Sequence, residues 1–322
     1  MTGLHDVLQA HVDSRSAPGL VALIARGDRI EVQVAGFADA AGSRSMARDS
    51  IFRIASMSKP IVAAAAMTLI DDGRMTLADP VARWLPELAS PSVLRTLGSP
   101  VEDVVPALRP ITVYDLLSSR AGHGFPSDFS LPVVRLLLEL GPGTSPGSCP
   151  PPDEWLARLA RIPMLSQPGE AWLYNTSSDI LGVLIARVAG RPLPGFLEVR
   201  LFEPPGMLDT GFEVPVGKLD RFTSLYGRTP AGEIELIDAP DGQWSRPPAF
   251  PSHRAVRRNG GSDVPRRRTG WGTVSLIRLV SVAAHESVPD YPDRVSGPVT
   301  EGASGPYGDR FRCAPSGCVG DD

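Results

Sequence analysis

Lysine is nearly absent from this chain, and cysteine is rare. Only Lys59 and Lys218 occur among the 322 residues, so arginine carries almost all of the positive charge. We interpret this bias as the mark of a GC-rich coding sequence. The three cysteines, Cys149, Cys313 and Cys318, fit neither a disulfide framework nor a paired-cysteine metal site.

The chain also lacks the features of a membrane or nucleic-acid protein. No run approaches the roughly 18 apolar residues of a membrane span, and the first ten residues lack the basic and apolar segments of a signal peptide. The formal charge of −4 argues against nucleic acid or an anionic membrane as the main partner. We therefore expect a cytoplasmic protein that binds neither. Its oligomeric state cannot be inferred from these patterns.

Local patterns predict both helices and strands, and hence an α/β (α+β) fold. Apolar residues at helical spacing open the chain, and two apolar runs around Gly27–Asp28 predict a β-hairpin over residues 20–36. An alanine-rich segment from Pro60 to Asp72, ended by Gly73, predicts a buried helix. Three further helices are expected at residues 113–118, 153–160 and 178–189, the last closed by Gly190.

Ser56 and Lys59 form an S-x-x-K motif at the start of the alanine-rich helix. Helical spacing places the hydroxyl and the amine on one face, within reach of each other. A lysine among other polar groups can lose its proton near neutral pH and accept that of the serine. Chance alone produces about one such motif in a chain of this length. On spacing alone, the pair could equally be a surface serine and lysine at a helix start.

The sequence around this motif resembles the serine β-lactamase family. That family contains class C β-lactamases, D-alanyl-D-alanine peptidases and β-lactamase-like esterases. The resemblance begins with Ile-Phe-Arg-Ile-Ala-Ser-Met-Ser-Lys-Pro and recurs in order up to residue 252, in residues 51–60, 79–86, 111–118, 167–182 and 202–212. It implies an antiparallel sheet flanked by helices, a mostly helical second region, and an active site in the cleft between them. It also implies catalysis through an acyl-enzyme without a metal or cofactor.

The resemblance assigns a second motif to Tyr174, in the position of the tyrosine of Y-x-N. In the family this tyrosine lies over the serine and relays its proton, although a core tyrosine with a locally satisfied hydroxyl is the alternative. Thr176 replaces the expected asparagine, and Asn175 stands one place early. This departure is typical of esterase-like members and counts against efficient β-lactam turnover. His123 lies in an expected loop and is not required by this chemistry.

The third motif of the family, K-T-G or H-x-G or a Trp/Gly-rich variant, is missing. Neither K-T-G nor H-x-G occurs after residue 252, and we regard Gly270–Val274 as a chance likeness to the Trp/Gly variant. The expected hairpin therefore lacks its partners from the C-terminal third. We divide the chain into a hydrolase domain, residues 1–252, and a poorly packed tail, residues 253–322. We hypothesise that a frameshift in the gene or its sequencing produced this tail, and a genuine, diverged tail is the alternative.

The sequence thus predicts a serine hydrolase of small esters or related amides, with Ser56 as nucleophile and Lys59 and Tyr174 as proton carriers. Trp172, Trp244 and Phe250 could line its acyl pocket, although aromatic residues more often belong to a core. Two alternatives stay open. The chain could be an inactive remnant that only binds ligands, or it could be a β-lactamase or peptidase.

Overall fold

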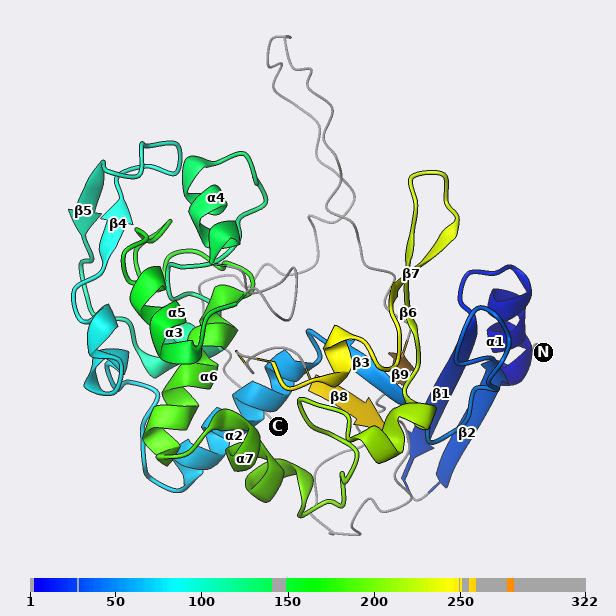
Figure 1. The fold of residues 1–322 in the computed structure, drawn as a ribbon. Coiled ribbons are helices and arrows are strands. Elements are labelled where there is room, and N and C mark those ends of the chain that lie inside the picture. The colour runs from blue at the N-terminus through cyan, green and yellow to red at the C-terminus, as the bar shows by residue number, and fades with distance from the viewer. Residues whose placement is uncertain are drawn as a thin grey trace, which may run out of the picture. The chain divides into compact units, whose positions relative to one another are not determined.

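The computed structural model describes residues 3–27, 29–140, 149–248 and 250, and the backbone of residues 255–258 and 277–280. All of them lie in the first of the two units into which the chain divides, Met1–His285. Helices and strands are both present (Figure 1), as the sequence predicts.

The N-terminal hairpin consists of β1 (Gly19–Arg26) and β2 (Arg29–Gly36), which pair antiparallel without a register shift. Alternate residues of a strand face opposite sides, and both sides of β1 are covered. Leu20 and Ala22 pack with Leu8 of α1 (Leu4–Asp13), whereas Val21 packs with Phe52 on the other side. Figure 1 shows α1 lying along this hairpin. The predicted helix and hairpin are therefore both present.

The strands beyond residue 252 correct one expectation. Strand β9 (Ile277–Val280) pairs antiparallel with β1, and β8 (Ala255–Arg258) pairs antiparallel with β3 (Ile51–Ala55). The hairpin does have a partner, because β9 takes up the hydrogen-bonding edge of β1 that would otherwise stay open. The domain boundary at residue 252 stays a prediction.

Two long helices, α2 (Ser58–Asp71) and α6 (Thr176–Ala189), pack against each other in the largest core cluster. Ten of the 14 residues of α6 are buried, as expected for a helix that is apolar on most of its surface. Gly190 closes α6 in the left-handed conformation, as predicted. The predicted alanine-rich helix begins two residues early, at Ser58. The face of α2 in this core consists of Val62, Ala65, Ala66 and Leu69.

The other predicted helices lie close to their expected positions. They are α3 (Val113–Leu117) and α5 (Pro152–Leu159), and both α3 and α5 contact α6. Besides β3, β8 and β9, several elements were not predicted from the sequence. They are α4 (Pro132–Glu139), α7 (Leu193–Leu197), a π-helical turn (Glu198–Phe202), and the paired strands β4 (Ser92–Leu94) with β5 (Val104–Pro106) and β6 (Leu225–Arg228) with β7 (Ile234–Asp238). Short 3-10 turns cover Val81–Arg83, Pro86–Leu88, Val216–Arg221 and Gln243–Ser245.

A buried ion pair connects β3 to the end of β7. The Arg53 guanidinium lies 2.5 Å from a carboxylate oxygen of Asp238, and the two side chains are only 5% and 8% exposed. Arg53 also donates to the Thr223 carbonyl and lies over the Phe222 ring, 3.9 Å from its centroid. Because Arg53 is three residues before Ser56, these contacts hold the strand that leads to Ser56.

We expect Asp238→Asn to lower the free energy of unfolding by about 3–5 kcal/mol, because it leaves the Arg53 charge buried without its counterion. Urea denaturation followed by circular dichroism measures this change. Arg135→Ala is the matched control, because it breaks an ion pair whose side chains are 85% and 58% exposed and should cost less than about 1 kcal/mol. Equal effects of the two substitutions would contradict the assignment.

Candidate active site

Ser56 lies in the tight connection between β3 and α2. Ala55 has a positive φ of 41°, which is uncommon for a residue with a side chain. The turn is held by hydrogen bonds from the Met57 N–H to the Ile54 carbonyl (2.8 Å) and from the Ser58 hydroxyl to the Ala55 carbonyl (2.7 Å). The backbone therefore passes through a strained residue directly before Ser56, and Ser56 itself is exposed.

Lys59 follows one helical turn later and points back to the serine. Its Nζ lies 3.0 Å from the Ser56 Oγ, as the spacing predicts. The ammonium also lies 4.7 Å from the centroid of the Tyr174 ring, which is a cation–π contact. Lys59 is thus held between the two other candidate residues.

Tyr174 reaches the same oxygen from the start of α6. Its hydroxyl lies 2.9 Å from the Ser56 Oγ, across 118 positions of sequence. The next residue, Asn175, has φ 82° and ψ −71°, and the Thr176 N–H lies 3.2 Å from the Tyr174 carbonyl. These values describe a γ-turn with positive φ, a rare and strained conformation. The segments that carry Ser56 and Tyr174 therefore both enter their helices through a strained residue.

The loop formed by residues 119–125 holds the backbone of Tyr174. Phe125 and Tyr174 exchange two backbone hydrogen bonds, of 2.9 and 3.3 Å, and Leu173 donates to the Ser119 carbonyl at 2.9 Å. Gly124 has φ 152°, and a Cβ there would lie 2.8 Å from the Tyr174 carbonyl oxygen. Only glycine allows this approach without a shift of the backbone. Gly124 was not predicted from the sequence as a residue that positions Tyr174, although the Gly-His-Gly pattern of residues 122–124 is a signal of a tight backbone approach.

Asp115 supports this loop from α3. Its carboxylate binds the Arg109 guanidinium at 2.6 and 2.8 Å and accepts from both the N–H and the hydroxyl of Thr112, the N-cap of α3. Burial raises the pKa of Asp115, but the hydrogen bonds from Arg109 and Thr112 outweigh burial and hold this pKa below its ordinary value. The Asp115 carbonyl accepts from the Arg120 N–H, at the base of the loop.

The two residues that depart from the Y-x-N pattern, Asn175 and Thr176, are both occupied at the start of α6. Asn175 donates its side-chain amide to the Asp179 carboxylate at 3.3 Å, and Thr176 is buried as the first residue of α6. Asp179 thus pairs locally near the start of α6. The asparagine amide is engaged within α6, and no hydrogen bond connects it to Ser56 among the described residues.

The three aromatic residues predicted near an acyl pocket lie in different environments. Trp172 is 62% exposed, and its ring centroid is 6.0 Å from that of Tyr174. Trp244 is half-buried in the Gln243–Ser245 turn. Phe250 is buried against Trp155, with ring centroids 4.8 Å apart, and belongs to the main core. Trp172 is therefore in ring contact with a candidate catalytic residue.

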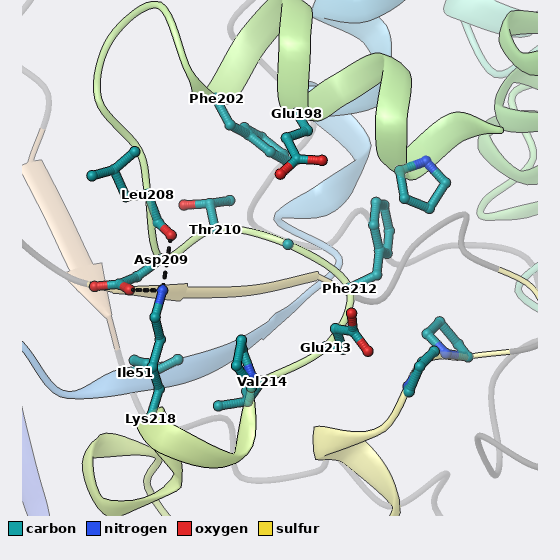
Figure 2. Close-up of a pocket in the computed structure, with 15 residues that line it drawn as sticks. Ile51, Glu198, Phe202, Leu208, Asp209, Thr210, Phe212, Glu213, Val214 and Lys218 are labelled. Carbon is teal, nitrogen blue, oxygen red and sulfur yellow. Dashed lines mark hydrogen bonds and ion pairs between the residues drawn. The ribbon is translucent and has the colours of Figure 1, made fainter. Parts of the chain in front are cut away.

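A separate cavity of about 340 Å³ is lined in part by Ile51, the first residue of β3. Ser56 follows the last residue of that strand. Figure 2 shows Lys218 bound to Asp209 and to the Leu208 carbonyl at the edge of this cavity. Hydrogen bonds from Arg221 and Lys218 hold the pKa of Asp209 at about 2, although burial acts in the opposite direction. Neither Ser56, Lys59 nor Tyr174 lines this cavity, so the candidate chemistry lies elsewhere.

The described residues contain no group of three or more His, Cys, Asp and Glu side chains that could hold a metal ion. In the same residues no single helix is long and apolar enough to cross a membrane, and only the bent pair of residues 176–189 and 193–202 has that length and composition.

The family model for beta-lactamases matches residues 4–275. The chain belongs to the beta-lactamase family. Esterase EstB of Burkholderia gladioli is 33% identical over 210 residues, which are 65% of this chain and 50% of that one. Protein Rv1367c of Mycobacterium tuberculosis is 36% identical over 215 residues, 66% of this chain and 52% of that one.

Solved structures of this beta-lactamase family agree with the fold. EstCE1, described as a hydrolase with promiscuous acyltransferase activity, superposes with a TM-score of 0.64 at 29% identity, and the match covers 78% of this chain and 67% of that one. The family and fold expected from the sequence are confirmed. The chain spans about half the length of the curated relatives it matches. Residues 270–274, which we regard as a chance likeness to the Trp/Gly variant of the third motif, lie outside the described residues.

His123 has a structural place within this beta-lactamase fold. It is 1% exposed, and its Nε2 lies 3.0 Å from the Ile162 carbonyl oxygen. Nδ1 has no hydrogen-bond partner among the described residues. Burial lowers the pKa of His123 from 6.5 to about 4, and the hydrogen bond to Ile162 opposes this effect only in part. The ring is therefore neutral at pH 7, with Nε2–H as the donor.

This burial of His123 predicts a pH dependence of stability. Between pH 6.5 and about 4 the unfolded chain binds a proton at His123 and the folded chain does not, so stability is lost as the pH falls through this window. The loss is on the order of 3 kcal/mol. Urea denaturation at several pH values measures it. In His123→Gln, which keeps a donor for Ile162, the slope should become smaller; an unchanged slope would contradict the assignment.

Proposed function

We propose that this chain is a serine hydrolase that cleaves small acyl esters, or related amides, through an acyl-enzyme on Ser56. One observation carries the proposal: the Ser56 Oγ lies within hydrogen-bond distance of both the Lys59 amine (3.0 Å) and the Tyr174 hydroxyl (2.9 Å). A weak nucleophile becomes effective when a neighbouring base takes its proton. The Ser56 Oγ thus has two candidate proton acceptors beside it, and this activation requires at least one.

The proposed reaction has two steps. The Ser56 proton moves to the Lys59–Tyr174 pair while the Ser56 Oγ forms a bond to the ester carbonyl carbon. The bond to the alcohol oxygen breaks, and Tyr174 returns the proton to this oxygen as the alcohol leaves. Water then attacks the acyl-enzyme, gives up its proton by the same route, and releases the acid and Ser56.

The start of α2 supplies part of the stabilisation of the developing oxyanion. The N–H of Ser56 engages no carbonyl oxygen among the described residues and lies just before α2. Positive partial charge gathers at a helix N-terminus and favours a negative oxygen there. A second N–H donor would come from the third motif of the family, which the sequence lacks in its usual forms.

The relatives favour ester substrates. EstB is named an esterase, and EstCE1 is described as a hydrolase with acyltransferase activity. Thr176 in place of the asparagine of Y-x-N supports esters over β-lactams. We keep two alternatives: a β-lactamase or peptidase, which would turn over nitrocefin, and a remnant that binds ligands without turnover, which the missing third motif favours.

We expect the protein to hydrolyse p-nitrophenyl butyrate and the Ser56→Ala variant to release p-nitrophenol only at the rate of buffer, because the acyl-enzyme cannot form. Absorbance at the nitrophenolate band measures the rate. Ser90→Ala, at an exposed serine, is the matched control and should keep the full rate. If the unchanged protein and Ser56→Ala both release p-nitrophenol only at the rate of buffer, the result supports the non-catalytic remnant.

Tyr174→Phe should lower kcat for the same ester about 10²- to 10⁴-fold, because it removes the proton carrier but keeps the ring over which Lys59 lies. KM should change little. Tyr114→Phe removes the hydroxyl of a tyrosine that is 57% exposed and serves as the control. A kcat for Tyr174→Phe within twofold of the unchanged protein would rule out the relay.

A further inference from the structure

Apolar side chains gather on the Tyr174 side of the candidate nucleophile. Phe125 and Tyr174 are directly opposite each other in an antiparallel bridge, so their side chains lie on the same side of the backbone. Trp172 precedes Tyr174 by two residues, and its ring centroid lies 6.0 Å from that of Tyr174. Phe129 stacks on Phe125 with ring centroids 5.7 Å apart and an interplanar angle of 6°.

Two ring pairs, Phe125 with Phe129 and Trp172 with Tyr174, are thus joined by the backbone bridge between Phe125 and Tyr174. We call these four residues the aromatic wall. The wall is open to solvent, since Trp172 is 62% exposed, Phe129 46% and Tyr174 43%. None of its members except Tyr174 has a polar group that the proposed reaction uses. Covering exposed aromatic surface with an apolar group lowers the free energy, and pairs of rings add a preference for stacked or tilted geometry.

The position of the wall decides which part of a substrate it would touch. In the proposed reaction Tyr174 returns the proton to the leaving alcohol oxygen, so this oxygen must lie within reach of the Tyr174 hydroxyl. The group attached to that oxygen then lies beside the rings that flank Tyr174. The acyl group is attached to the carbonyl carbon above the Ser56 Oγ and extends in a different direction.

We infer that the Ser56 site selects esters whose alcohol portion carries an aromatic ring or a comparably bulky apolar group, through contact with the aromatic wall. The inference rests on the proposed function. It predicts that a ring on the alcohol side raises kcat/KM, whereas the same ring on the acyl side does so less.

The test compares ethyl butyrate, benzyl butyrate and ethyl phenylacetate as substrates of the full chain. We expect benzyl butyrate to have the highest kcat/KM. Trp172→Ala and Phe129→Ala should each reduce the benzyl-to-ethyl ratio about fivefold to tenfold, because each removes one ring contact. Leu108→Ala, at an apolar residue that is 84% exposed and outside the wall, should leave the rate and the ratio unchanged. Circular dichroism confirms that the variants fold.

The outcomes separate the inference from the proposed function. Hydrolysis that depends on Ser56 but shows a benzyl-to-ethyl ratio near one, a ratio that survives both substitutions, or a preference for ethyl phenylacetate would overturn the inference alone. If no ester is hydrolysed, the proposed function fails, and calorimetric titration of the same chain with benzyl butyrate decides the inference. Binding that Trp172→Ala abolishes supports the wall, and absence of binding overturns it.

Discussion

The packing of α2 against α6 is the contact on which the candidate site depends. Ser56 comes two residues before α2, and Tyr174 comes two residues before α6. When these helices pack side by side, the segments that enter them meet, although 118 positions separate Ser56 from Tyr174. The alanines of α2 make this contact possible, because small side chains allow two helix backbones to approach closely. A core interaction therefore sets the distance between the two hydroxyl groups.

Strain and support occur together at this meeting point. Ala55 and Asn175 both have positive φ, and each lies next to a candidate catalytic residue. Such conformations cost on the order of 1–3 kcal/mol each and persist only where the surroundings hold them. On one side the Arg53–Asp238 pair holds β3. On the other side the loop at residues 119–125, supported by Asp115, holds the backbone of Tyr174.

The described residues of the candidate site are exposed to solvent, and this exposure affects which surface a substrate would contact. Ser56, Trp172 and Tyr174 are exposed, whereas the cavity of about 340 Å³ near Ile51 contains none of them. A substrate at Ser56 would therefore meet the exposed rings of the aromatic wall on the Tyr174 side of the site.

The sequence by itself determined the local features and the family. The Ser56–Lys59 pair could be predicted because three residues of helix bring two side chains onto one face, and Gly190 could be predicted as a helix end because glycine adopts positive φ without strain. Tyr174 was predictable only through the family resemblance, since nothing local connects it to Ser56. The tertiary structure alone decided that β9 pairs with β1, that Arg53 meets Asp238, and that Phe125 lies opposite Tyr174. Each of these contacts joins residues far apart in the chain, and such contacts depend on how the core packs as a whole, which no local pattern of residues specifies.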